Sequence, residues 1–229
     1  MAVDPGLYVV TAESAPGLIA ERAYLDLRDR IVTLRLPPGA VLREDELMAE
    51  LGIGRTPLRE AVKRLTLENL VAVRPRRGTF VTDVHPSDIA ALTEVRAELE
   101  GFAAQLAATR LDEEGRALVR ALLAEVDVLD RQGDQDGLMR LDQRVHRLTW
   151  AQSRNPYLVE TLERSFTLSL RIWYVVLDRM PTLRATVHRQ TQLLEALLTG
   201  DGVAARALMH EHVLAFQRDV ARAIAHDSR

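Results

Sequence analysis

Apolar residues recur every three or four positions in three stretches of the N-terminal part of the chain, which is the spacing of amphipathic helices. The stretches cover residues 18–34, 44–51 and 56–68. The segment Gly52-Ile53-Gly54 predicts a tight turn between the second and the third. Thr56 stands directly before a proline, and proline is favoured at the first helical position, so we expect Thr56 to cap the third helix.

Two short runs rich in β-branched residues follow the third helix, Leu70–Val73 and Thr79–Val81. They flank the segment Arg74-Pro75-Arg76-Arg77-Gly78, so the pattern predicts a β-hairpin with a basic tip. Asn69 is expected to adopt the left-handed conformation that ends a helix. Two helices, a turn, a third helix and a basic hairpin are the order of a winged helix-turn-helix, whose third helix enters the major groove of DNA.

Six further helical stretches follow residue 83, and no strand pattern occurs among them. Helices of this length joined by short turns form antiparallel bundles. We therefore expect a mainly α protein with a flexible tail (1–17), a winged helix-turn-helix with a small β-hairpin wing (18–82) and an all-α antiparallel bundle (83–229). The expected bundle helices cover residues 86–109, 113–132, 134–153, 156–179, 182–199 and 202–226.

Charge is divided unevenly between these two parts. The whole chain carries a net charge of −3, whereas residues 53–82 hold seven arginines and lysines against two glutamates, a net +5, and residues 83–229 carry −4. A basic segment of this kind indicates contact with an anion such as DNA, the alternative being a solvated charged face. The absence of cysteine excludes disulfides and Cys-based zinc sites. Short apolar runs and the lack of a leader pattern predict a cytoplasmic protein that does not enter a membrane.

The segment from residue 36 to residue 81, LPPGAVLREDELMAELGIGRTPLREAVKRLTLENLVAVRPRRGTFV, resembles the DNA-binding domain of the GntR family of transcription regulators. Glu94–Glu100 resembles the opening helix of the FadR-type effector domain, called FCD. The resemblance implies a homodimeric repressor that binds a short palindromic operator in double-stranded DNA. It also implies a small carboxylate effector that binds in the helical domain.

The candidate DNA contacts are basic and polar residues of the third helix and of the hairpin, unless these are ordinary surface charges. Arginine can bind guanine O6 and N7 with two hydrogen bonds, so we expect the helix to read bases and the hairpin to bind phosphate or the minor groove. The family pattern is broken at Gly54, where relatives carry Ser or Thr, and at Asp45, where many carry Arg. The candidates are Arg55, Thr56, Arg59 and Lys63 on the helix and Arg74, Arg76 and Arg77 on the hairpin.

A second group of candidates lies in the helical domain. Asp142 and His146 are four residues apart and share a helix face, an arrangement that by itself is more often a surface pair than a site. His212 lies on the last helix, and antiparallel pairing around Asp201 places Gln190 opposite it.

The motif DxxxHxxxxxxxxN, which begins at Asp142, resembles metal-binding FCD domains, whose ligands are one Asp and three His. The corresponding residues here are Asp142, His146, Gln190 and His212. An amide oxygen is a weaker ligand than imidazole, so the resemblance implies a weakened site for a divalent ion such as zinc, nickel or manganese. His188 and His210 are each displaced by two residues from the matching positions, which turns them to another helix face.

The remaining candidates concern the effector. Arg96 resembles the family residue that meets the effector carboxylate, with a surface ion pair as the alternative, and Asn155 and Arg171 are further candidates. The chain has no glycine-rich phosphate loop, no cysteine nucleophile and no HExxH motif, so we expect no enzyme activity. Two other functions stay open: an architectural DNA-binding dimer without effector, and a metal-dependent hydrolase fused to a DNA-binding domain.

Overall fold

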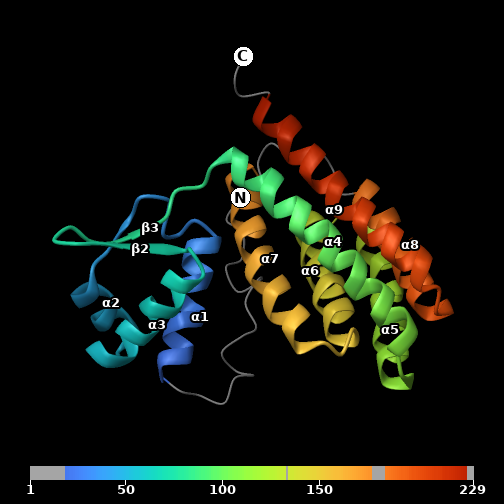
Figure 1. Ribbon diagram of the computed structural model, residues 1–229, viewed down its shortest axis with the longest axis horizontal. Coiled ribbons are helices and arrows are strands. Elements are labelled where there is room, and N and C mark those ends of the chain that lie inside the picture. The colour runs from blue at the N-terminus through green and yellow to red at the C-terminus, as the bar shows by residue number, and fades with distance from the viewer. Residues whose placement is uncertain (1–18, 133, 177–183, 226–229) are drawn as a thin grey trace. The chain divides into compact units, whose positions relative to one another are not determined.

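The computed structural model describes residues 19–132, 134–176 and 184–225 of the 229-residue chain (Figure 1). The expected tail, residues 1–17, lies outside the described residues. Contacts divide the chain into two compact units. Among the described residues, the first contains those up to 85 together with Leu170–Val175, and the second contains those of Pro86–Ser169 and those from Val176 onward. The mainly helical fold class predicted from the sequence is confirmed.

The first unit contains the three expected helices, α1 (Ile19–Val32), α2 (Glu44–Leu51) and α3 (Arg55–Leu67). α1 packs against α3, and their facing apolar side chains form the centre of this unit. The fully buried residues of this contact include Leu27, Ile31, Leu58 and Leu65. The apolar spacing of the sequence thus sets which face of each helix is covered.

The start of α3 corrects one expectation. Gly54, not Thr56, is the N-cap residue, and the helix begins at Arg55. Pro57 therefore occupies the third helical position and not the first, which costs little because the first backbone N–H groups of a helix have no intrahelical acceptor. Gly52 ends α2 in the left-handed conformation, with φ of 63°. The turn between α2 and α3 thus depends on glycine at Gly52.

The wing is a β-hairpin formed by β2 (Val71–Arg74) and β3 (Gly78–Val81). In the antiparallel register Val71 lies opposite Val81 and Arg74 lies opposite Gly78. Asn69 has the expected left-handed conformation, with φ of 59°. A third strand that the sequence did not indicate, β1 (Val41–Leu42), pairs with the other side of β3, so the sheet order is β1-β3-β2. Two residues are too few to show an alternating pattern.

The second unit is a bundle of long helices, as predicted. They are α4 (Pro86–Arg110), α5 (Glu113–Gln132), α6 (Gln135–Gln152), α7 (Pro156–Val176), α8 (Arg184–Thr199) and α9 (Gly202–Ala225). The segment Leu170–Val175 of α7 groups with the first unit. Their ends agree with the expected ones within a few residues. The exceptions are the expected end of α7 and the expected start of α8, because residues 177–183 lie outside the described residues.

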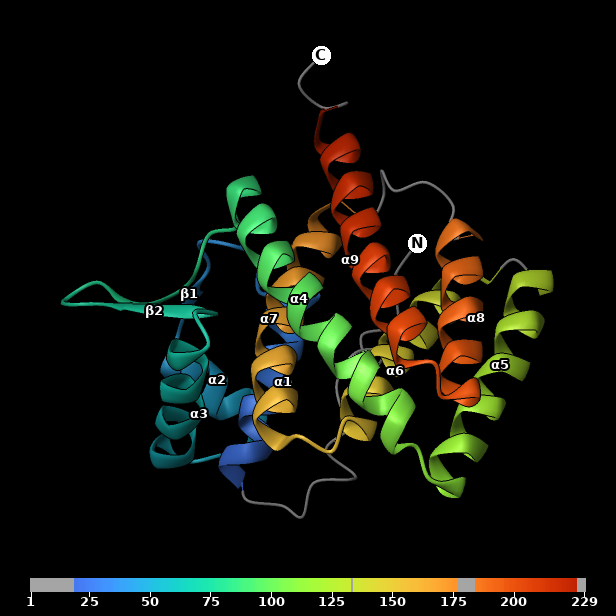
Figure 2. The ribbon, with the colours of Figure 1, turned by 45° about the vertical axis from the view of Figure 1, so that its right-hand side comes forward.

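Helices α4 and α9 run side by side along much of their length (Figures 1 and 2). The backbones approach closely at Gly101, where a Cβ atom would lie only 3.2 Å from the carbonyl oxygen of Arg206. Gly101 thus lets the two helices approach more closely than a larger residue would allow. This contact aligns α4 with α9, and these two helices carry part of the candidate site described below.

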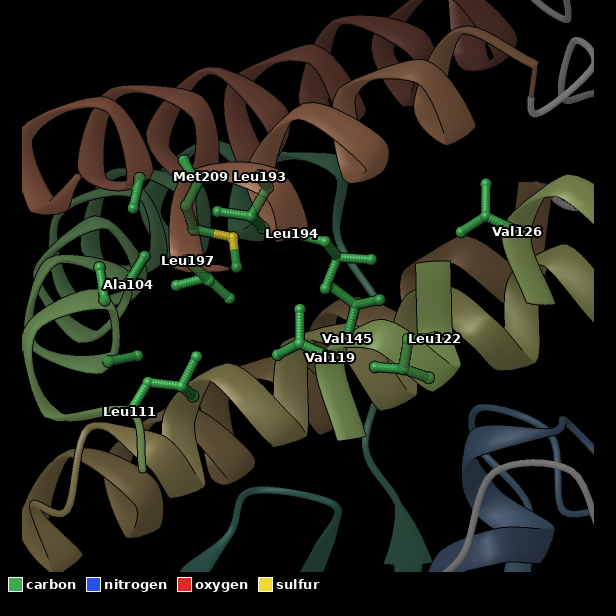
Figure 3. Packing of buried hydrophobic residues seen from close by; sticks show 14 of the residues in the cluster. Ala104, Leu111, Val119, Leu122, Val126, Val145, Leu193, Leu194, Leu197 and Met209 are labelled. Atoms are coloured by element: carbon green, nitrogen blue, oxygen red, sulfur yellow. The ribbon is translucent and has the colours of Figure 1, made fainter. Parts of the chain in front are cut away.

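The apolar core of the bundle lies among α4, α5, α6, α8 and α9. Figure 3 shows aliphatic side chains from these helices directed toward one another. Leu194 and Val119 have no exposed surface, and neither does Ala104 on the facing part of α4. Close packing of this kind means that each deleted methyl group leaves an unfilled space.

We predict that Leu194→Ala destabilises the bundle by roughly 2 to 5 kcal/mol, the usual cost of truncating a fully buried leucine. Urea unfolding followed by circular dichroism measures the change. The matched control is Leu118→Ala on α5, because Leu118 is 47% exposed and should change stability by only about 0.5 kcal/mol. Equal effects of the two substitutions would contradict the assignment of Leu194 to the core.

Candidate functional site

The outer face of α3 carries four of the predicted DNA contacts. Arg55 and Arg59 are one helical turn apart, and Thr56 and Lys63 are exposed on the same helix. The buried residues of α3 point the other way, toward α1, so this face is free to meet a ligand. The arrangement offers a row of three cations, Arg55, Arg59 and Lys63, on the exposed face of α3.

Two carboxylates of α2 lie against these arginines. Asp45 Oδ1 is 3.5 Å from Arg55 Nη2, and Glu44 Oε2 is 3.4 Å from Arg59 Nε. All four side chains are at least one-third exposed, so each pair contributes little to stability. The carboxylates nevertheless lower the positive potential of this face of α3.

The basic residues of the wing are also exposed. Arg74, Arg76 and Arg77 surround the turn between β2 and β3. Arg76 has a positive φ of 61°, and the Arg74 guanidinium lies 5.2 Å from the centre of the Phe80 ring. The turn thus holds three cations at the end of a hairpin that extends away from α1, α2 and α3 (Figure 2).

Within the second unit, the structure brings together all four residues of the predicted metal group. Asp142 and His146 come from α6, His212 from α9 and Gln190 from α8. His146 Nε2 is 3.0 Å from His212 Nε2 and 3.7 Å from Asp142 Oδ2, and His212 Nε2 is 3.3 Å from Asp142 Oδ1. The side chains of the two histidines are almost completely buried.

These separations suit ligands of one divalent ion. Donor atoms bound tetrahedrally at roughly 2.0 to 2.1 Å lie about 3.3 Å from one another, within the range seen among Asp142, His146 and His212. One carboxylate oxygen and two imidazole nitrogens are also donors that bind such ions well. The residues present therefore fit a divalent metal.

Gln190 is hydrogen-bonded to this cluster through its amide nitrogen. Its Nε2 donates to Asp142 Oδ1, while its Oε1 is buried without a hydrogen-bond partner among the described residues. His212 Nδ1 is likewise buried without a described partner. The amide N–H₂ group of Gln190 thus supplies a hydrogen bond to the Asp142 carboxylate, and the amide oxygen of Gln190 can still accept a hydrogen bond.

Glu100 is a member of the site that the sequence analysis missed. It lies on α4, it is completely buried, and its carboxylate accepts hydrogen bonds from side chains of α4 and α6. Arg96 Nε donates to Oε1 at 2.7 Å, Trp150 Nε1 donates to Oε2 at 3.2 Å, and His146 Nδ1 bonds Oε2 as well. The available signal was its position, four residues after Arg96 on a helix lined with small apolar residues.

The carboxylates of the site are strongly acidic despite their burial. Burial alone would raise the pKa of Glu100, but Arg96 and His146 outweigh it and lower that pKa to about 2. Burial opposes ionisation of Asp142 in the same way, and the two histidines lower its pKa to about 2. Both groups are therefore anions at neutral pH.

The candidate effector residues take different places. Arg96 is buried and forms an ion pair with Glu100. The pair therefore lies in the interior and not on the surface. Asn155 Oδ1 accepts bonds from the backbone N–H groups of Tyr157 and Leu158 and caps α7. Arg171 Nη1 donates to Thr82 Oγ1 at 2.8 Å. The described bonds of Asn155 and Arg171 thus go to partners outside the metal group.

The two other histidines near this region were expected to point elsewhere. His210 Nε2 lies 3.3 Å from Glu98 Oε1 and is partly exposed. The side chain of His188 lies outside the described residues. None of the described helices is both long enough and apolar enough to cross a membrane.

Two family models match this chain. Residues 19–81 match the model "Bacterial regulatory proteins, gntR family", and residues 91–215 match the model "FCD domain". The two matches cover the winged helix-turn-helix and most of the bundle.

Individual proteins are similar over most of the chain. An HTH-type transcriptional regulator in an unstable DNA locus of Streptomyces ambofaciens is 33% identical over 213 residues, which are 89% of this chain and 85% of the relative. The solved structure of Escherichia coli McbR/YncC has a TM-score of 0.77 at 24% identity and covers 92% of this chain and 99% of its own. The metal-free FCD domain of TM0439 has a TM-score of 0.53 at 16% identity, over 63% of this chain and 99% of its own. At these identities the two structures support the fold.

We predict that stability in the presence of EDTA falls as the pH decreases from about 5 toward 2. Glu100 and Asp142 have pKa values of about 2 in the folded protein, below their ordinary values. The unfolded chain therefore takes up protons that the folded chain does not, and folding loses free energy. Urea unfolding at a series of pH values should give a shallower acid slope for Glu100→Gln. Glu94→Gln, an exposed site on the same helix, should keep the original slope.

Proposed function

Because the chain belongs to the GntR family of bacterial regulatory proteins and carries an FCD domain, we propose that it is a repressor whose operator binding is controlled by a small molecule. That it is a transcriptional regulator follows from the family and from its named relatives. These names also favour a regulator over a hydrolase. We further propose that it acts in the cytoplasm, where bacterial DNA lies.

The observation that supports DNA recognition is the exposed basic face of α3. Arg55, Thr56, Arg59 and Lys63 lie on a projecting helix of a winged helix-turn-helix, the element that enters the major groove in this motif. Arg55 and Arg59 would bond to base edges, because guanidinium groups match guanine O6 and N7. Arg74, Arg76 and Arg77 on the wing would bind phosphate or the minor groove and set the register of the domain.

We propose that the protein binds DNA as a homodimer. One reading helix contacts only a few base pairs, whereas two helices related by a two-fold axis contact both half-sites of a palindrome. The additional contacts would raise the affinity to the level that a specific operator requires.

We predict that Arg59→Ala weakens operator binding by roughly 1 to 3 kcal/mol and relaxes base preference at one position of each half-site. Selection of bound sequences from a random DNA pool first identifies the operator. Fluorescence anisotropy titrations then compare the operator with random DNA. The contrasting variant is Arg76→Ala, which should weaken binding to both DNAs alike and reduce the salt slope by about one contact. If Arg59→Ala leaves affinity and base preference unchanged in a folded protein, α3 does not read DNA as proposed.

For the second unit, we propose that Asp142, His146 and His212 hold a divalent ion, with Gln190 as a weak fourth partner. The proposal is supported by the convergence of three donor atoms at ligand spacing. When bound, the ion would attract an anionic oxygen of the effector, which would favour small carboxylates. Arg96 contacts Glu100 through Nε and Nη2, so its Nη1 donors could meet the effector carboxylate.

Control of DNA binding requires that the effector prefers one of two states of the dimer. We propose that it binds the DNA-competent and the incompetent arrangement of the winged domains with different affinities. The effector can shift the equilibrium only by the difference between these affinities.

We predict that Gln190→His binds Zn²⁺ more tightly than the natural protein by about tenfold, or roughly 1.4 kcal/mol. Imidazole is a better ligand than an amide for this ion. Calorimetry with a competing chelator measures the affinity, and elemental analysis measures the metal retained after purification. His146→Ala and His212→Ala should lose most of the binding. The matched control, Gln192→His, places an imidazole on the exposed side of α8 and should change nothing. No gain in a folded Gln190→His protein would show that these four side chains do not form the site.

A further inference from the structure

The buried residue Glu100 is not among the metal-group residues that the resemblance to metal-binding FCD domains implies. It lies beside that group, and its two oxygens contact different side chains. Oε1 accepts a hydrogen bond from Arg96 Nε at 2.7 Å and forms an ion pair with Arg96 Nη2 at 2.6 Å. Oε2 accepts bonds from Trp150 Nε1 and from His146 Nδ1. Each oxygen is thus fully engaged and completely shielded from water.

The charge of Glu100 decides which ring nitrogen of His146 carries a proton. The other partners of Glu100, Arg96 and Trp150, are donors, so its carboxylate accepts, and the contact requires a proton on His146 Nδ1. In a neutral imidazole the other nitrogen, Nε2, is then unprotonated. That nitrogen faces His212 Nε2 at 3.0 Å and Asp142 Oδ2 at 3.7 Å.

The local charges leave room for a cation. When both histidines are neutral, the Arg96 guanidinium compensates only one of the two carboxylates, that of Glu100. Trp150 and the ring of Phe166, 5.0 Å from the His146 ring, pack around the imidazole and keep it from turning. Orientation and tautomer of His146 are therefore both fixed from outside the metal group.

We propose that Glu100 is a positioning residue, which holds His146 in the tautomer whose unprotonated Nε2 is presented to Asp142 and His212. The proposal rests on the proposed function, because it concerns how well the group binds a divalent ion. Groups that orient a metal-binding histidine in this way commonly change metal affinity by about 10 to 100-fold when they are replaced. Arg96 and Trp150 hold Glu100 in place in turn.

The test combines a binding measurement with a direct observation of the tautomer. Glu100→Gln keeps the shape but adds an N–H₂ group, so Arg96 or His146 must lose an acceptor. We expect its Zn²⁺ and Mn²⁺ affinities, measured by calorimetry, to fall about 10 to 100-fold. Glu94→Gln on the exposed side of α4 is the control and should bind like the natural protein. A folded Glu100→Gln protein with unchanged affinity for both ions would overturn the proposal.

Nitrogen NMR of the natural protein tests the tautomer without any change at Glu100. In metal-free protein at pH 8, long-range ¹H–¹⁵N spectra should show a proton on His146 Nδ1 and none on Nε2, with the signals assigned by their loss in His146→Gln. A proton on Nε2 would overturn the proposal even if Glu100→Gln does not fold. If the tautomer is as expected but neither ion binds the natural protein, the proposed metal site fails while the positioning of His146 by Glu100 stands.

Discussion

A buried negative charge constrains the interior of the helical unit. Moving a carboxylate out of water costs several kcal/mol unless paired donors replace the lost hydration. Glu100 obtains these donors from Arg96 on its own helix and from His146 and Trp150 on α6. The requirement fixes the rotation of α4 relative to α6, because a turn of either helix would leave the charge uncompensated. The aliphatic packing around Leu194 supplies most of the burial, but it could tolerate several arrangements that this polar group excludes.

Much of the fold could be predicted because each element has a strong local signal. The helices of the bundle are long and end at Gly, Pro, Asn or Asp, so their bounds follow from the sequence. Short features without a periodic signal were harder. β1 has only two residues and is stabilised by pairing with a strand far along the chain. The cap of α3 was misplaced by two residues, because proline is tolerated throughout the first helical turn and not only at its first position.

Part of the candidate site could also be predicted from the sequence, because it depends on regular helix geometry. Asp142 and His146 are separated by one helical turn, and antiparallel geometry around Asp201 placed Gln190 opposite His212. Glu100 was missed because an arginine and a glutamate four residues apart look like a surface pair when burial is not known. The bonds of Asn155 to the start of α7 are local, reaching only two and three residues ahead, and fit an Asn that stands directly before a proline. The bond of Arg171 to Thr82 depends on a contact between distant parts of the chain, which no spacing rule supplies.

The carboxylates of Glu44 and Asp45 beside α3 have a kinetic consequence. A regulator searches a genome by binding random DNA briefly and leaving it again, and the duration of each visit depends on its contacts to phosphate. In the proposed mode of DNA binding, Arg55 and Arg59 would have to separate from these carboxylates before they contact DNA. Random DNA would compensate little for the loss of these ion pairs, whereas two hydrogen bonds to a guanine would compensate for it. The acidic start of α2 would therefore shorten the time lost at each wrong site and speed the search for the right one.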